Sequence, residues 1–215
     1  MANYTDISIL LDRSGSMADI KASMESGLKE FIQGHKEVPT TRLTLIQFDD
    51  QQPCEQLYVE RPITDVPEFT LKPRGWTPLL DSLCEAIDRT GARLAAKKES
   101  DRPEKVLFLI ITDGAENSSR KFRREDVQKR IHTQSNTYKW EFSYLGANQD
   151  AYKEAATLGI DYGKTLNFIA SAGATTNAWK GLTTNTVAYS ANLTSTLVNY
   201  TPDQIKSAVK DEVTP

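Results

Sequence analysis

The chain has 215 residues, 26 Lys and Arg against 29 Asp and Glu, a formal net charge of −3, 39% hydrophobic residues and two cysteines. This size and composition indicate one ordinary globular domain and exclude a disulfide-stapled scaffold, which needs far more cysteine. The near-balanced charge argues against nucleic acid as a partner, because nucleic-acid-binding domains usually carry a basic stripe.

The sequence also argues against a membrane or secreted protein. The longest apolar run covers only residues 106–111, whereas a spanning helix needs ~20 apolar residues. The first residues carry Asp6 and Asp12 around a short apolar stretch, without the basic start of a secretory signal. Cys54 and Cys84 have no second Cys or His at metal-ligand spacing, which favours reduced thiols and argues against zinc. We therefore expect a cytoplasmic protein.

Short segments rich in Ile, Leu, Val and Phe alternate with amphipathic stretches of helical length, which is typical of a doubly wound α/β sheet. The first strand is expected at residues 6–11. A helix over 17–34 follows, with Gly34 suited to its C-cap. Strands at 42–48 and 56–63 are joined by a link too short for a helical crossover, so they should pair antiparallel.

The remaining elements are expected in this order: a helix over 78–97 opened by Pro78, a buried strand at 106–112, a helix near 124–134, a strand at 140–145, a helix over 150–158 and a weak strand at 165–169. After Ala170, apolar residues from Trp179 to Leu193 favour a final helix, although its many threonines lower helix propensity. The segment 201–204 matches a capping box and predicts a short helix in the tail. We expect one domain over 1–198 and a tail over 199–215.

The strongest chemical signal is Asp12-Arg13-Ser14-Gly15-Ser16, at the end of the first strand. Ligands of open parallel sheets bind outside the carboxyl ends of the strands. A carboxylate and two hydroxyls on a tight turn can point three oxygens at one spot, and hard cations such as Mg²⁺ bind such oxygens. Alternatively, a serine caps the following helix and Asp12 accepts backbone N–H groups.

Two later segments favour the metal hypothesis. Thr77 lies in a loop that enters a helix, and Asp113 follows the second strongly buried strand. If the two buried strands are neighbours, Asp12 and Asp113 converge, with Thr77 between them.

This constellation resembles the von Willebrand factor type A domain and its metal-ion-dependent adhesion site. The family pattern is Asp-x-Ser-x-Ser, then a Thr, then an Asp, and these positions read Asp12, Ser14, Ser16, Thr77 and Asp113. The resemblance covers residues 4–195 by the order of elements. It implies a Rossmann-like, mostly parallel six-stranded sheet in the order 3-2-1-4-5-6, with one antiparallel edge strand and helices on both faces.

The resemblance further implies that Ser14, Ser16 and either Thr77 or one aspartate bind Mg²⁺ directly, with Mn²⁺ and Ca²⁺ as alternatives, while the other groups act through water. It implies a non-enzymatic module that captures a Glu or Asp carboxylate of a partner protein. The motif wording is similar to small stand-alone bacterial or phage members. Intracellular relatives often work beside AAA+ ATPases or within stress-response operons, so these are the partner classes that we expect.

Other residues support weaker hypotheses. Glu116 and Asn117 could orient metal-bound water or a partner, but ordinary loop residues are the preferred interpretation. Arg13 and Trp76 flank the motif and could contact a ligand, or Trp76 could pack under its own loop.

The basic run 121–124, with Lys129 and Arg130, is expected to be a solvated helix face rather than a partner surface. His35 and His132 are expected on the surface.

Two alternative functions stay open. Aspartates at strand ends can also serve a Mg²⁺-dependent phosphohydrolase, but haloacid-dehalogenase-type phosphatases use Asp-x-Asp, and Ser14 stands in the second position here. A bound metal could also do no more than stiffen three loops. The sequence contains neither Gly-x-Ser-x-Gly nor a phosphate-binding Gly-x-x-x-x-Gly-Lys-Ser/Thr loop.

Overall fold

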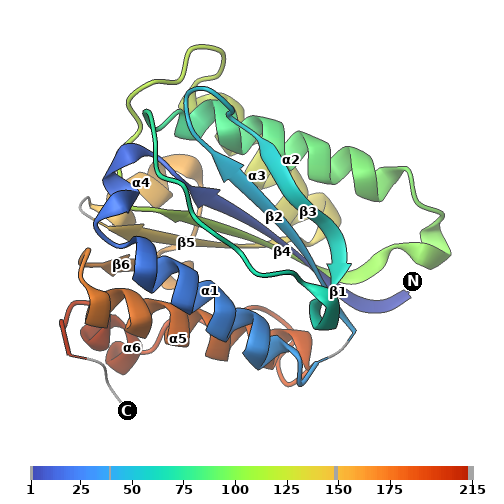
Figure 1. Ribbon diagram of the computed structural model, residues 1–215. Helices are drawn as coiled ribbons and strands as arrows, with labels where there is room; N and C mark the ends of the chain where they lie inside the picture. Colours follow the sequence, from blue (N-terminus) through green and yellow to red (C-terminus); the bar gives the residue numbers. More distant parts are fainter. Residues whose placement is uncertain (1, 39, 148–149, 213–215) are drawn as a thin grey trace.

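A computed structural model describes residues 2–38, 40–147 and 150–212 (Figure 1). Six strands form one sheet in the order β3-β2-β1-β4-β5-β6. Only β3 runs antiparallel to its neighbour, so the expected fold class, strand order and antiparallel edge are confirmed. The strands are β1 (Ala2–Asp12), β2 (Thr41–Phe48), β3 (Glu55–Pro62), β4 (Pro103–Thr112), β5 (Glu141–Ala147) and β6 (Thr165–Phe168).

Helices cover both faces of the sheet (Figure 1). One face packs against α1, α5 and α6, and the other against α2, α3 and α4. The helices are α1 (Lys21–His35), α2 (Leu79–Ala95), α3 (Arg124–Tyr138), α4 (Ala151–Leu158), α5 (Ala172–Ser190) and α6 (Pro202–Ser207). A 3₁₀ turn, η1 (Gly15–Ala18), precedes α1. None of the helices in the described ranges is long and apolar enough to cross a membrane.

The central strand β1 explains how the sheet is held. Successive side chains of a strand point to opposite faces; accordingly Ile7, Ile9 and Leu11 pack on the α1 side, and Leu10 packs on the α2 side. Because β1 is parallel to β4, with Leu11 opposite Ile111, their carboxyl ends lie next to each other. This register brings the loops after the two strands together.

Close packing of α1 on α5 corrects one expectation. Gly34 does not cap α1, which continues to His35 and has Lys36 as its C-cap. A Cβ at Gly34 would lie 2.7 Å from Thr183 Cγ2, and one at Gly27 would lie 2.0 Å from the buried ring of Trp179. Both glycines therefore allow the two helices to approach, a contact that local sequence does not reveal.

His35 is also not on the surface, contrary to the expectation. Its exposed fraction is 0%, because it follows Phe31 by four residues and shares the buried face of α1. His35 Nδ1 lies 2.8 Å from the Phe31 carbonyl oxygen. Burial lowers the pKa of His35 to about 4. His132, by contrast, is exposed as expected.

The final helix forms, but it ends at Ser190, and Leu193 is 76% exposed. The predicted capping box is present, since the Thr201 N–H donates to Gln204 Oε1 (2.8 Å) and the Gln204 N–H donates to Thr201 Oγ1 (3.2 Å). Gln204 Nε2 also donates to Asn185 Oδ1 (3.0 Å), which holds α6 against α5. The ends of the two expected segments, residue 1 and residues 213–215, lie outside the described residues.

Both cysteines are free thiols, as predicted, and both are buried. Burial raises the pKa of Cys54 to about 11 and that of Cys84 to about 12.

Candidate metal-binding site

Asp12 ends β1 and is fully buried. Its Oδ1 accepts a hydrogen bond from the Ser14 N–H (2.6 Å), and its Oδ2 accepts one from the Thr112 hydroxyl at the end of β4 (2.6 Å). Burial raises the pKa of Asp12 to about 7, against these hydrogen bonds, and the nearby charge of Asp113 acts in the same direction as burial. The adjacent ends of β1 and β4 thus bring the carboxylates of Asp12 and Asp113 close enough for their charges to interact.

Hydroxyl groups connect the loop after β1 to Asp113. Ser14 Oγ and Ser16 Oγ are 3.1 Å apart, and the Ser16 hydroxyl donates to Asp113 Oδ1 (2.7 Å). Asp113 is 2% exposed, and its Oδ2 has no hydrogen-bond partner within the described ranges. Burial raises the pKa of this carboxyl group. Three predicted residues from two loops therefore form one chain of oxygen atoms.

Thr77 reaches the same place from the loop before α2. Its N–H donates to Asn117 Oδ1 (2.9 Å), and its carbonyl accepts from the Asn117 N–H (3.2 Å). A Cβ at Gly114 would lie 3.3 Å from Thr77 Oγ1 and 3.6 Å from Ser16 Oγ. Gly114 thus leaves room between the two hydroxyls.

The structure brings all five predicted site residues to the carboxyl end of the sheet: Asp12, Ser14, Ser16, Thr77 and Asp113. Their donors are carboxylate and hydroxyl oxygens, which suit hard divalent cations. Within the described part of the chain, no three His, Cys, Asp or Glu side chains are grouped as a metal site, so binding would depend on the hydroxyls. A buried carboxylate is costly without a counter-charge, and Asp113 Oδ2 has an unused acceptor. These residues fit a divalent cation, and their role as ligands stays a prediction.

Arg13 is a buried residue that holds the loops in place. It is 6% exposed, and its Nε–H donates to Asp49 Oδ2 (2.5 Å), to which Arg74 Nε–H also donates (2.7 Å). Arg13 additionally pairs with Glu55. The backbone joins the same loops, since the Arg74 N–H donates to the Arg13 carbonyl (2.8 Å). A single carboxylate from the β2–β3 turn therefore fixes two loops of the site.

Trp76 is 64% exposed, so it does not pack under its own loop. The backbone N–H of Trp76 donates to Asp50 Oδ1 (2.9 Å). The preceding Gly75 has a φ of 68°, and a Cβ there would lie 1.9 Å from the same oxygen. Glycine is required at this turn, which presents the indole to solvent beside Thr77.

Glu116 is more than an ordinary polar residue of an exposed loop. Its carboxylate accepts from the N–H groups of Leu80 (2.9 Å), Ser118 (2.9 Å) and Ser119 (2.7 Å). It therefore satisfies a free N–H at the start of α2, where a negative charge is also favoured by the helix dipole. Together with Asn117, Glu116 fixes the loop after β4 to the loop that carries Thr77.

Asp81 has a similar role, which was not predicted from the sequence. It lies in the first turn of α2 and is 7% exposed. Its carboxylate accepts from the backbone N–H groups of Arg120 (2.9 Å), Lys121 (3.0 Å) and Phe122 (2.9 Å). An acidic residue early in a predicted helix is a visible signal, but the sequence does not reveal that its donors lie about forty residues away.

The basic run divides into two parts. Arg124 in α3 pairs with Glu154 (2.5 Å), and Arg130 pairs with Asp88 (2.8 Å). The sequence predicted a solvated helix face, and the structure adds that the cations of this part are paired. Lys121 and Arg123, with neighbouring Arg120, lie before or at the start of α3 and are exposed.

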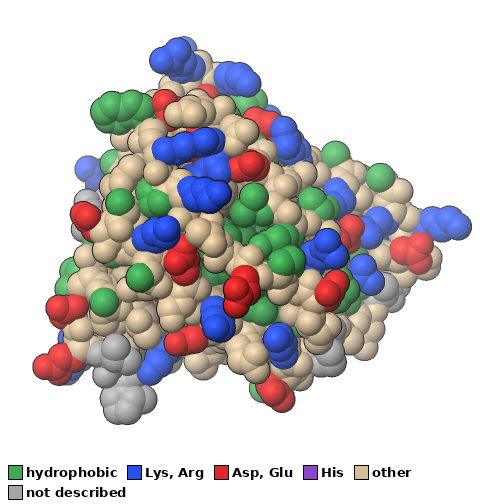
Figure 2. Space-filling view, viewed as in Figure 1, with side chains coloured by type: hydrophobic (Ala, Val, Ile, Leu, Met, Phe, Trp, Pro, Cys, Tyr) green, Lys and Arg blue, Asp and Glu red, His purple; other side chains and the backbone are tan. Residues whose placement is uncertain are grey.

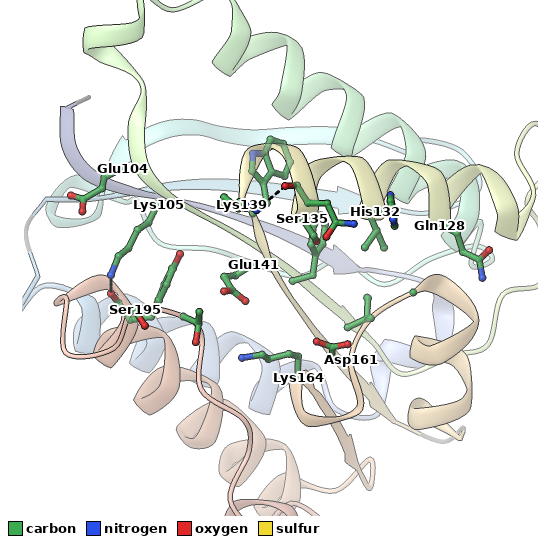
Figure 3. A pocket seen from close by; sticks show the side chains of 18 residues that line it. Glu104, Lys105, Gln128, His132, Ser135, Lys139, Glu141, Asp161, Lys164 and Ser195 are labelled. Carbon is green, nitrogen blue, oxygen red and sulfur yellow. Dashed lines mark hydrogen bonds between the residues drawn. The ribbon is translucent and has the colours of Figure 1, made fainter.

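A pocket of about 800 Å³ lies at the opposite end of the sheet, near the starts of β4 and β5 (Figure 3). Glu141 lies between Lys105 and Lys164 in this view. Lys105 Nζ donates to the Tyr189 carbonyl near the end of α5 (2.6 Å), and Lys139 Nζ donates to the Asn136 carbonyl near the end of α3 (2.8 Å). These two lysines therefore serve as caps of helix ends.

No family model matches the sequence, and no curated protein matches it. Solved structures do resemble the fold. Proximal thread matrix protein 1 from the mussel byssus has a TM-score of 0.63 and 16% identity, over 86% of this chain and 48% of that one. A von Willebrand factor type A protein from Catenulispora acidiphila has a TM-score of 0.53 and 14% identity, over 87% and 44%. The ArnB paralog VWA2 from Sulfolobus acidocaldarius has a TM-score of 0.52 and 17% identity, over 87% and 45%.

These likenesses define the class of fold, that of a von Willebrand factor type A domain. The chain spans less than half the length of each of these neighbours. One structure of the mussel protein is described with a zinc-occupied MIDAS motif, so a protein of similar fold holds a divalent metal.

Proposed function

We propose that the chain is a non-enzymatic, divalent-cation-dependent protein-binding module. The observation that carries this proposal is the buried Asp113 Oδ2 without a hydrogen-bond partner in the described ranges, beside hydroxyls from two other loops. Mg²⁺ is the expected ion, and Mn²⁺ and Ca²⁺ are alternatives because all three bind oxygen ligands. The zinc in the mussel protein supports a divalent cation at this type of site.

The five proposed ligand residues differ in the charge that they contribute. Asp12 and Asp113 together neutralise a divalent ion, whereas Ser14, Ser16 and Thr77 contribute oxygens without charge. When bound, the cation supplies an electrophilic position for one further carboxylate. Thr112 holds Asp12, and Ser16 holds Asp113, so the oxygens are oriented before any ligand arrives. Because Ser16 is exposed while Asp12 is buried, the partner would approach from the Ser16 side.

The proposed partner is a protein that presents a Glu or Asp. The resemblance of the motif to bacterial and phage-type members makes AAA+ ATPases and stress-response proteins the first classes to test, in the cytoplasm. This assignment rests on the sequence resemblance alone.

Calorimetry of the full chain with Mg²⁺, Mn²⁺ and Ca²⁺ tests the site directly. Asp12→Ala and Asp113→Asn should each abolish binding, since each removes one of two charges that neutralise the ion. The matched control is Asp203→Ala, an exposed aspartate in the first turn of α6, which should bind as the wild type does. Normal metal binding by both site variants would show that the assignment is wrong.

Three further measurements separate the alternatives. Turnover of phosphate esters with Mg²⁺ that is lost in Asp12→Asn would favour a phosphohydrolase. A pull-down from native lysate with and without EDTA, compared with Asp12→Ala, tests partner capture. If chelation lowers the melting temperature but changes no association, the metal only stiffens the loops.

A further inference from the structure

The loop between β4 and α3 carries an unusual group of cations, which we call the basic loop (residues 120–123). Arg120, Lys121 and Arg123 are exposed, and none of them forms an ion pair within the described ranges. In the adjoining helix, Arg124 and Arg130 both have carboxylate partners. The basic loop therefore carries three exposed positive charges that form no ion pair with the described residues.

The backbone of the basic loop is fixed. The buried carboxylate of Asp81 accepts from three consecutive N–H groups, those of residues 120–122. Just before it, Glu116 binds the N–H groups of Ser118 and Ser119. A surface whose backbone is already ordered loses less entropy when a partner binds.

The basic loop lies beside the candidate metal site. Asp81, which binds the backbone of the basic loop, lies in the first turn of α2, and Thr77 precedes that helix by two residues. Asn117, in the same loop, is hydrogen-bonded to Thr77. Lys and Arg side chains gather at the upper end of the molecule (Figure 2), where Figure 1 shows the loop after β4. A segment bound at the metal would thus pass close to these cations.

We propose that the basic loop recognises additional acidic residues of the same partner segment whose Glu or Asp binds the metal. The partner would then present an acidic stretch rather than an isolated carboxylate. This inference rests on the proposed function of the site. The protein as a whole carries a net charge of −3, so this positive surface is a local feature, and a protein segment fits it better than a nucleic acid, which needs a broader basic surface.

Two immobilised synthetic peptides test the proposal with the full chain and millimolar Mg²⁺. The first contains one Glu among Gly and Ser, and the second contains the same Glu followed by three Asp. Exposed ion pairs are individually weak, so three of them should make the second peptide bind about tenfold tighter than the first. The triple variant Arg120→Gln, Lys121→Gln, Arg123→Gln should bind the two peptides equally.

The matched control changes three exposed lysines elsewhere: Lys36→Gln, Lys98→Gln and Lys206→Gln. It alters the net charge by the same amount and should keep the tenfold preference. If the triple variant of the basic loop keeps that preference, the proposal is overturned while metal-dependent binding stands. Calorimetry of the triple variant of the basic loop with Mg²⁺ should give the wild-type affinity for the ion within about twofold, since none of its three substituted side chains is a predicted ligand.

The variant Asp113→Asn tests the proposed metal-dependent binding itself, separately from the role of the basic loop. It should release both peptides, and binding of the acidic peptide that survives in Asp113→Asn and in EDTA would overturn metal-mediated capture. If a single-stranded oligonucleotide binds more tightly than the acidic peptide, the proposed protein partner is wrong and the basic loop recognises a nucleic acid instead.

Discussion

Asp49 and Asp113 are both buried carboxylates at the same end of the sheet, but their oxygens are satisfied differently. Asp49 accepts from the side chains of Arg13 and Arg74 and from the backbone N–H groups of Gln51 (2.7 Å) and Gln52 (2.8 Å). Asp113 accepts from Ser16 at one oxygen, and its other oxygen has no partner in the described ranges.

The pKa directions follow this difference. Burial acts to raise the pKa of Asp49, but hydrogen bonds from Arg74, Gln52 and Arg13 hold it below the usual value. At Asp113 burial dominates, and the pKa is raised. Burial alone therefore does not fix the direction in which the pKa of a carboxyl group shifts. Four donors satisfy Asp49, whereas Asp113 Oδ2 keeps an unused acceptor within the described ranges.

The largest predicted effect separates these two carboxylates by mutation. Asp49→Ala should lower the free energy of unfolding by about 3–5 kcal/mol, because it leaves the buried Arg13 without a main partner. Asp113→Asn, measured in EDTA, should change it by less than about 1 kcal/mol, since no buried cation loses its partner. Urea denaturation gives both values. Equal losses in the two variants would contradict the comparison.

The second prediction concerns metal. At a Mg²⁺ concentration of about 100 times the dissociation constant, the wild type should gain about 2.7 kcal/mol of stability, because the ion binds only the folded chain. Asp113→Asn should gain nothing. Thermal unfolding with Mg²⁺ and with EDTA measures the gain, and equal stabilisation of the variant would place the ion elsewhere.

The sequence predicted the fold, and it predicted that the five candidate site residues meet at one end of the sheet, because both depend on short patterns. Apolar runs such as residues 106–111 mark buried strands, and the end of a strand locates the residue that follows it, as for Asp12 and Asp113. Long-range partners leave no such pattern. Nothing adjacent to Asp49 indicates that two arginines from separate loops meet on it.

The same limit explains the errors on α1. Gly34 and His35 were assigned by local rules for helix ends and polar residues, whereas packing against α5 determines their environment. A helix face can be predicted from spacing, but the partner that covers it cannot.

The third prediction concerns the pH dependence of stability that arises from His35, a buried titratable side chain. Because the pKa of His35 is lowered by burial to about 4, the unfolded chain binds a proton between that value and about 6.5, the ordinary value of histidine, while the folded chain does not. The contribution of His35 to stability should therefore fall as the pH decreases, by about 2 kcal/mol between pH 7 and pH 5, while the raised pKa of Asp12 acts in the opposite direction in both the wild type and a His35 variant.

Urea denaturation of the wild type and of His35→Leu at both pH values isolates this contribution, because all other titrating groups are shared by the two proteins. That variant should lose about 2 kcal/mol less than the wild type over the same interval, because leucine takes up no proton. An identical pH dependence in the two proteins would assign the effect to other groups.

The smallest predicted effect concerns Asp81, whose donors are backbone N–H groups rather than arginines. Asp81→Asn keeps one acceptor oxygen and loses the charge, so it should cost about 1 kcal/mol of stability. Asp88→Asn in the same helix is the control, since the Asp88 side chain is 53% exposed and its pair with Arg130 should contribute less. Urea denaturation compares the two variants. Asp81→Asn should also reduce the preference for the acidic peptide, because the basic loop loses its anchor, whereas Asp88→Asn should leave it unchanged. A preference that survives Asp81→Asn intact would show that the three cations act without a fixed backbone.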